Sequence, residues 1–272
     1  MTVRVGTFLT LLVVLVAPAT ARAQTAAFSH DPARVAVGTT YEFVKSNLDG
    51  TQAIRVVARL AAADRIEVLK LEPENGSAAF VTARMNWETA SADSLESAVL
   101  FPDGTRRPQA LLVLDPRSHL VSVEVFGLRD TLTVGALPIH MYNFDFLSLA
   151  VALPHLADPD AGFTIGVMNP TFRPQPPLLR YEGEARFEPA GTDVRGGVRA
   201  RRYLVEGAGL SGTSLWTAES DGRLLAIESS IPDNPGWSSF RLELGSTTSM
   251  TDTAWATFVE GEVAALARAE GT

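Results

Sequence analysis

Alternation of apolar and polar residues runs through most of this chain and constrains its fold more than any other feature. Between residues 79 and 88, every second side chain is apolar, at Val81, Ala83, Met85 and Trp87. A period of two residues is typical of β-strands that bury one face. The same pattern recurs along the chain, at residues 39–46, 53–60, 65–71, 110–114, 120–126, 180–188, 198–206, 213–218, 223–229 and 239–245.

Short turn signals separate several of these segments. Asparagine or aspartate followed by glycine favours the two-residue turn of a β-hairpin. Such pairs occur at 49–50, 75–76, 103–104 and 221–222. Consecutive hairpins build antiparallel sheets, which commonly leave one face to water. We therefore predict a mainly β protein with a large antiparallel sheet.

Two segments lack this alternation and predict helices. Residues 143–153 are short and very apolar, with Asn143 as a candidate N-cap and Pro154 directly after the end. Asp145 falls in the first turn, where a negative charge is favourable. Near the C-terminus, apolar residues recur at helical spacing over 255–266. Helices this apolar must pack on a face of the sheet.

Residues 1–23 have the layout of a secretory signal peptide, with a basic start, an apolar run and small residues before the cleavage point. The run of about a dozen residues is too short to span ~30 Å of hydrocarbon. We expect export to the periplasm, with full secretion as the open alternative. We also expect a loose segment at 24–34 and no stable membrane insertion.

The amino-acid composition limits the classes of partner that the chain is expected to bind. The formal net charge of −8 argues against nucleic acid and anionic membranes as partners. Cysteine is absent, so the exported chain has no disulfides and no thiol for a lipid anchor. Stability must come from burial, which a hydrophobic content of 46% makes feasible.

Catalytic motifs are few. A cysteine nucleophile is impossible, and the four histidines lack the spacing of paired metal ligands on one strand or helix. No glycine-rich phosphate loop opens a helix. We predict neither a metal nor a cofactor. His140 and Asp145 are the remaining acid–base candidates, and they leave an exported hydrolase as one alternative.

Large apolar side chains are spread over the predicted strands and the short helix. In an ordinary sandwich they would form the core. If the sheet is wide and curved, they could instead line a cavity that holds an acyl chain. The candidate lining residues are Met85, Trp87, Phe144, Phe146, Leu147, Trp216 and Phe240.

The second half of the chain carries an ordered set of motifs. Residues 143–148 read Asn-Phe-Asp-Phe-Leu-Ser, and the later segments follow at 181–183, 201–206, 214–224 and 239–244. Over residues 137–246 the chain resembles an uncharacterised family of periplasmic domains, itself similar to the lipoprotein-localisation (Lol) carriers. The resemblance implies an open half-barrel with a helix in its mouth that binds an acyl chain or another apolar ligand. The chain departs from it by having extra strands over 39–126.

These observations combine into one hypothesis. We expect residues 35–272 to form a single β-rich half-barrel, with a possible subdivision near 127–176, cupping one or two apolar helices. Its function would be non-catalytic periplasmic binding of a lipid, an acyl chain or another amphiphile, free or on an acylated protein, with the helix as a removable plug. The main alternative is a cell-envelope structural or interaction protein with a filled core, which recruits an envelope protein by strand addition.

Overall fold

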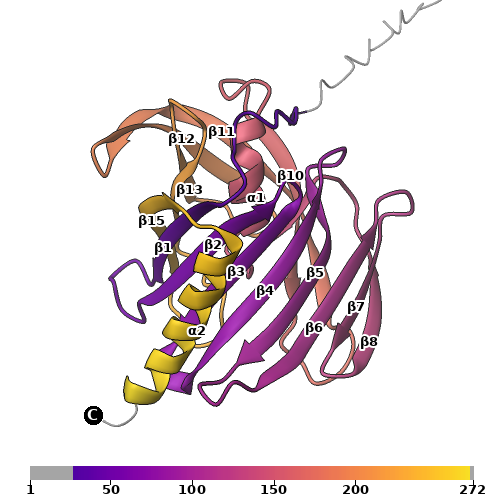
Figure 1. The fold of residues 1–272 in the computed structure, drawn as a ribbon. Coiled ribbons are helices and arrows are strands. Elements are labelled where there is room, and N and C mark those ends of the chain that lie inside the picture. The colour runs from indigo at the N-terminus through magenta and orange to yellow at the C-terminus, as the bar shows by residue number, and fades with distance from the viewer. Residues whose placement is uncertain (1–26, 270–272) are drawn as a thin grey trace, which may run out of the picture.

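The computed structural model describes residues 27–269, and the predicted signal peptide lies outside them. The chain forms one sheet of 15 strands with two α-helices, α1 and α2 (Figure 1). The prediction of a mainly β protein with a large, mostly antiparallel open sheet is therefore confirmed. The strands are β1 (Thr39–Ser46), β2 (Ile54–Ala62), β3 (Arg65–Glu72), β4 (Ser77–Asn86), β5 (Ser91–Leu100), β6 (Arg106–Asp115), β7 (Leu120–Val125), β8 (Leu128–Thr133), β9 (Ile139–Met141), β10 (Phe163–Pro170), β11 (Leu179–Arg195), β12 (Val198–Gly207), β13 (Thr213–Ala218), β14 (Leu224–Ser229) and β15 (Phe240–Ser249).

Two meanders share this sheet. From one end, the strand order runs backwards along the chain from β8 to β1, then passes to β15 and continues down to β9. All neighbours are antiparallel except β9 and β10. The strand pairing that joins the first meander to the second is that of β1 with β15.

The sheet curls so that its two ends approach each other. β8 lies beside β11, and β9 lies beside β5. The Leu178 amide donates to Asp130 Oδ2 at 2.8 Å, and the Ile139 amide donates to Ser91 Oγ at 2.9 Å. Right-handed strand twist, accumulated over many strands, produces this curvature. We call the space enclosed by the concave face the cup.

The helix α1 (Leu147–Ala152) fills the cup, and every one of its residues is buried. A single 3-10 turn at Leu153–His155 continues it. The prediction of a helix over 143–153 is thus right in type and wrong at its start. Asp145 and Phe146 adopt left-handed backbone conformations, with φ of 55° and 52°, and these cannot extend a helix.

The helix α2 (Asp252–Ala269) covers the outer face of the sheet. It crosses β3 and β4, as the yellow ribbon in Figure 1 shows. Trp255, Val263 and Leu266 from α2 pack against Leu69 and Leu71. The sheet is therefore apolar on both faces in this region, because Ile66 and Val68 of β3 belong to the main core inside the cup.

The segment predicted to be loose is held in place where it is described. Phe28 forms a β-bridge with Leu156, and the Ser29 amide donates to the His155 carbonyl at 2.8 Å. Arg34 Nη1 donates to the Pro154 carbonyl, also at 2.8 Å. The prediction was wrong for these residues because the 3-10 turn after α1 leaves carbonyl groups that this segment satisfies.

Candidate functional site

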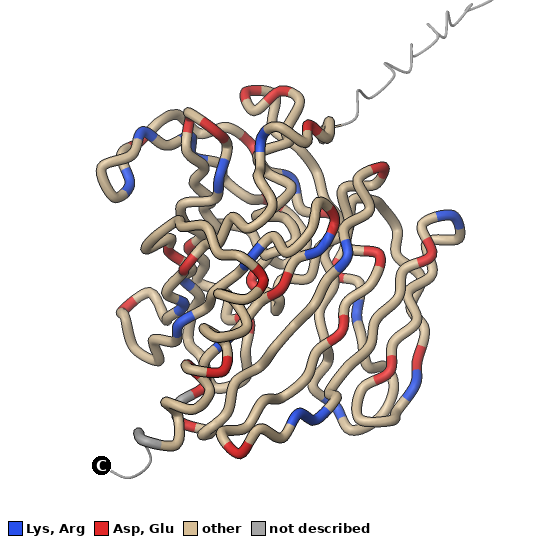
Figure 2. Tube along the Cα trace, viewed as in Figure 1, with Lys and Arg blue, Asp and Glu red and all other residues tan. Residues whose placement is uncertain are grey.

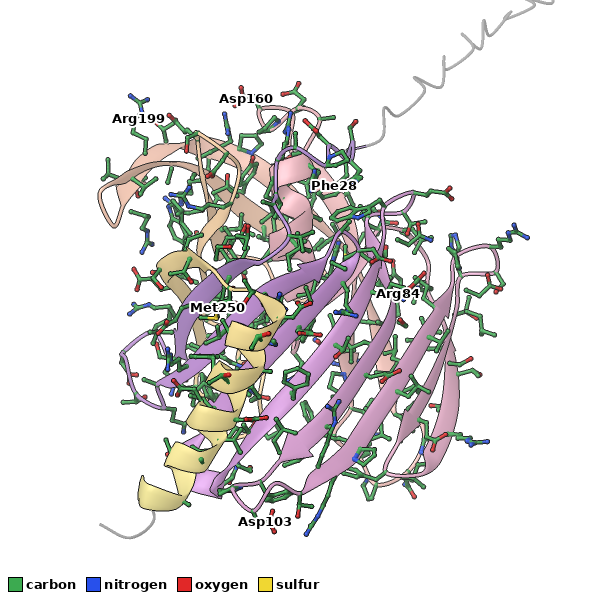
Figure 3. The ribbon with its side chains drawn as sticks, in the orientation of Figure 1. Phe28, Arg84, Asp103, Asp160, Arg199 and Met250 are labelled. Carbon is green, nitrogen blue, oxygen red and sulfur yellow. The ribbon has the colours of Figure 1, made fainter. Side chains whose placement is uncertain are left out.

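An open pocket of about 970 Å³ lies at one end of the cup. It is bordered by the N-terminal segment, the turn between β4 and β5, and the start of β10. We call it the rim pocket. Figure 3 shows Phe28, one of its lining residues, at the same end of the molecule as Asp160. A volume near 1,000 Å³ is at the upper end of the range for small-molecule sites.

Aromatic rings form one wall of the rim pocket. Phe163 on β10 stacks on Phe187 of β11, with ring centroids 4.5 Å apart. Phe28 meets the edge of Phe163 at 5.6 Å. The strand register sets this arrangement, because Phe163 and Phe187 are direct cross-strand partners.

Trp87 closes the opposite side, after β4. Its indole Nε1 donates to the Ala63 carbonyl at 2.9 Å, and its ring stacks on His30 at 4.2 Å. His155 packs against both rings and accepts a hydrogen bond at Nδ1 from the Asp31 amide. Burial, with His30 and Arg34 nearby, lowers the pKa of His155 to about 4. The ring is therefore neutral at pH 7, as an acceptor at Nδ1 requires.

The polar part of the lining is acidic. Glu88, Asp158 and Glu184 border the pocket, together with Arg186 and Glu188. Arg186 and Glu188 form an ion pair at 3.2 Å and offset each other. The rim pocket thus combines an aromatic wall with a net negative edge. Elsewhere both signs of charge are interspersed along the chain (Figure 2).

The loop 157–162 approaches β11 closely at a glycine. A Cβ on Gly162, whose φ is +73°, would lie 2.5 Å from the Phe187 carbonyl oxygen. Only glycine allows this approach. The close contact positions Ala161 and Asp158 at the pocket border.

Most of the predicted cavity-lining residues instead fill the cup. Met85, Phe144, Phe146, Leu147 and Phe240 are buried in the main core around α1. None of these five borders the rim pocket, and of the predicted set only Trp87 does. The expected hollow beside residues 144–153 is therefore occupied by the protein's own side chains.

Trp216 lies in a different cluster on the outer face. It is buried with Ala200, Ala218, Leu225 and Ala226. The guanidinium groups of Arg195 and Arg202 lie over its ring, at 3.8 and 5.5 Å from the centroid. Its assignment to the concave face was wrong, because β13 is buried along its whole length and its alternation does not mark one face.

Sequence reasoning missed the aromatic wall. Phe28 stands in the segment thought to be loose, and Phe163 begins a strand that was not predicted. Phe187 was recognised as a strand residue, since it alternates with Arg186 and Glu188. That signal gives the face of a strand but not which other segments reach it.

The predicted acid–base pair is not formed. His140 Nδ1 is hydrogen-bonded to Ser148 Oγ at 2.8 Å, and both residues are buried. Burial lowers the pKa of His140 to about 3, so the ring is neutral. Asp145 instead forms ion pairs with two lysines, Lys45 Nζ at 2.8 Å and Lys70 Nζ at 2.5 Å. His140 and Asp145 therefore do not work as one unit.

Comparison with known proteins adds no assignment: no family model matches the chain, and no curated protein matches it. Among residues 27–269, no group of three or more histidine, aspartate or glutamate side chains is arranged to hold a metal ion. No helix in the same part of the chain is both long and apolar enough to cross a membrane. The resemblance to the lipoprotein-localisation carriers stays a prediction.

Proposed function

We propose that the protein is a non-catalytic binder of an amphiphile, a lipid or an acyl chain, and that the rim pocket holds the ligand. The observation that carries this proposal is an open pocket of about 970 Å³ with a wall of Phe28, Phe163 and Phe187. Each methylene group buried there would contribute about 0.8 kcal/mol. The signal-peptide pattern supports an exported, periplasmic location for this activity.

The fixed position of α1 changes the expected mechanism. The helix is fully buried, and the residue two places before it, Asp145, is bound by two lysines. Removing it would expose the core and break these ion pairs. In our proposal the helix is permanent, and the ligand enters at the rim without displacing it.

Titration with a dansylated fatty acid tests the proposal. Phe28→Ala should weaken binding about tenfold, because one aromatic face worth ~1.5 kcal/mol or more is lost. Phe172→Ala is the matched control, since Phe172 is 56% exposed and does not border the pocket. Native mass spectrometry of the purified chain would report any lipid that it retains. Equal binding by both variants, or no binding by the wild type, would refute the proposal.

The filled cup also favours a second candidate, an envelope interaction protein. β8 is an end strand of the sheet, and most of its residues are exposed. An extended peptide could add to this edge by backbone hydrogen bonds. Failure of all acyl probes, together with loss of a partner after Thr131→Pro, would favour this function.

A further inference from the structure

The chain has two lysines, Lys45 and Lys70, among 23 basic residues, and both reach the same buried site. Every other basic residue in the sequence is arginine. Lysine differs from arginine in having an amine that can lose its proton and act as a nucleophile. The placement of both lysines inside the cup therefore points to chemistry that arginine cannot perform.

Lys45 on β1 lies between two carboxyl groups. Its Nζ is 2.8 Å from Asp145 Oδ1 and 2.6 Å from Asp233 Oδ2. Asp233 comes from the loop between β14 and β15, so the site joins three distant parts of the chain. The exposed fraction of the Lys45 side chain is 1%, and that of either carboxylate is 0%.

The surroundings are apolar and exclude solvent. The Lys45 ammonium lies 5.0 Å from the Trp237 ring centroid and 5.6 Å from that of Phe240. Charges in such a place are costly unless they are fully paired. Groups held in contact also react with very high effective molarity.

The two carboxyl groups are not equivalent. Lys70 contacts Asp145 and, against the effect of burial, helps Lys45 hold the pKa of Asp145 below its ordinary value. Asp233 is paired with Lys45 alone, and burial with the nearby Asp145 charge raises its pKa to about 7. Among the described residues, Asp233 Oδ1 has no hydrogen-bond partner. Asp145 is therefore ionised and in direct contact with the Lys45 ammonium, where it can accept a proton, and Asp233 is suited to be a neutral acyl group.

We propose that Lys45 and Asp233 condense to form an intramolecular amide, with Asp145 as the proton carrier. The contacts on Lys45, its burial among aromatic rings and the exclusive use of lysine at this site support the proposal. The product would tie β1 to the loop between β14 and β15 in a protein that has no cysteine.

The reaction needs no external reagent. Asp145 first accepts a proton from the Lys45 ammonium, and the neutral Nζ attacks the Cγ of protonated Asp233. The carbon–hydroxyl bond of Asp233 then breaks, and the hydroxyl takes the proton from Asp145 and leaves as water. Asp145 finally removes a proton from the new amide nitrogen and releases it to solvent, which leaves Asp145 ionised. One N–C bond forms, one C–O bond breaks, and one water is released.

Removal of the buried charges favours the product. The Lys45 ammonium and the protonated Asp233 become one neutral amide, so the site holds one buried charge fewer. The link also restricts the unfolded chain over a long loop, as a disulfide would. Lys70 and Asp145 then form a simple ion pair.

Mass spectrometry of the denatured full chain decides the question. The measured mass of the wild type should be lower than the mass calculated from its sequence by one water. The measured mass of Lys45→Arg should equal the mass calculated from its own sequence. The same should hold for Asp145→Asn, whereas the mass of Asp103→Asn, in an exposed turn, should stay lower by one water. Comparing variants makes the result independent of N-terminal processing.

Amine labelling in denaturant gives a second readout that does not depend on any variant folding. Lys70 should react and Lys45 should not, and a tryptic digest should contain the peptides of Lys45 and Asp233 joined. A wild-type mass that equals the sequence, with both lysines labelled, would overturn the proposal and leave an ion-pair network at this site.

Discussion

Beneath α1, aromatic rings and charged groups pack together with almost no exposed surface, whereas at the rim the half-buried ring of Phe28 and acidic side chains border open space. In the cup, Lys45 meets Asp145 and Asp233 next to Phe240. At the rim, Phe163 and Phe187 stack on each other below the surface, and Phe28 and the carboxylates of Glu88 and Glu184 border the pocket. The closely packed site in the cup is thus suited to a reaction or a fixed contact within the chain, whereas the open rim pocket is suited to an incoming ligand.

The comparison predicts its largest effect at Lys45. Lys45→Met removes the contacts of Lys45 with Asp145 and Asp233, together with the amide that we propose, and should cost at least about 3–5 kcal/mol of unfolding free energy. Urea denaturation measures this loss. Arg84→Met breaks an exposed ion pair with Asp64 and should cost less than ~1 kcal/mol. Similar losses in the two variants would show that the buried site contributes no more to stability than an exposed ion pair does.

The next largest difference between the cup and the rim should be the cost in stability of truncating a leucine. Leu149→Ala empties space in a fully buried helix and should cost about 3 kcal/mol. Leu137→Ala, at the border of the rim pocket, should cost about 1 kcal/mol, because the site is already partly open. Thermal or urea unfolding of both variants checks the contrast, and a reversed order would contradict it.

The loss of stability at acidic pH should arise in part from a buried histidine in the cup. The pKa of His140 is about 3 in the folded protein and ordinary when unfolded, so below pH ~6.5 only the unfolded state binds this proton. His140 therefore makes the folded protein lose about 1.4 kcal/mol per pH unit as the pH falls from ~6 toward 4. Stability curves of the wild type and His140→Asn should diverge in this range, with the shallower slope in the variant.

The smallest expected effect concerns the segment that covers the rim. Arg34→Ala removes the bond to the Pro154 carbonyl and should cost about 0.5–1.5 kcal/mol. The dansylated fatty acid should then associate faster with the variant than with the wild type, while the affinity of the variant stays close to that of the wild type. Stopped-flow mixing measures the rate, and an unchanged rate would show that this segment does not limit access.

The strands were predictable where one face is buried. Residues 121–124 of β7 and the second half of β4, from Val81, follow the expected alternation, because their polar positions are more exposed than the apolar ones. β13 and β14 are buried nearly throughout, so their sequences identify strands but not faces. That ambiguity is the reason Trp216 was placed on the wrong side of the sheet.

The candidate sites depended on long-range contacts that periodicity does not report. The rim pocket exists because Trp87 and Phe163 are brought together when the sheet curls. The start of α1 was misplaced because Asp145 binds Lys45 and Lys70 instead of serving a helix N-terminus. A signal for the buried site was nevertheless present in the composition, since the chain has only these two lysines.

Pairing of β1 with β15 has a consequence for how the molecule is made. The seam that unites the two meanders pairs the first strand of the sheet with the last, so the sheet stays incomplete until both meanders have been synthesised. Contacts between such remote segments also form slowly. A delay of this kind would keep the nascent polypeptide extended for longer, as the export that we propose for this protein would require.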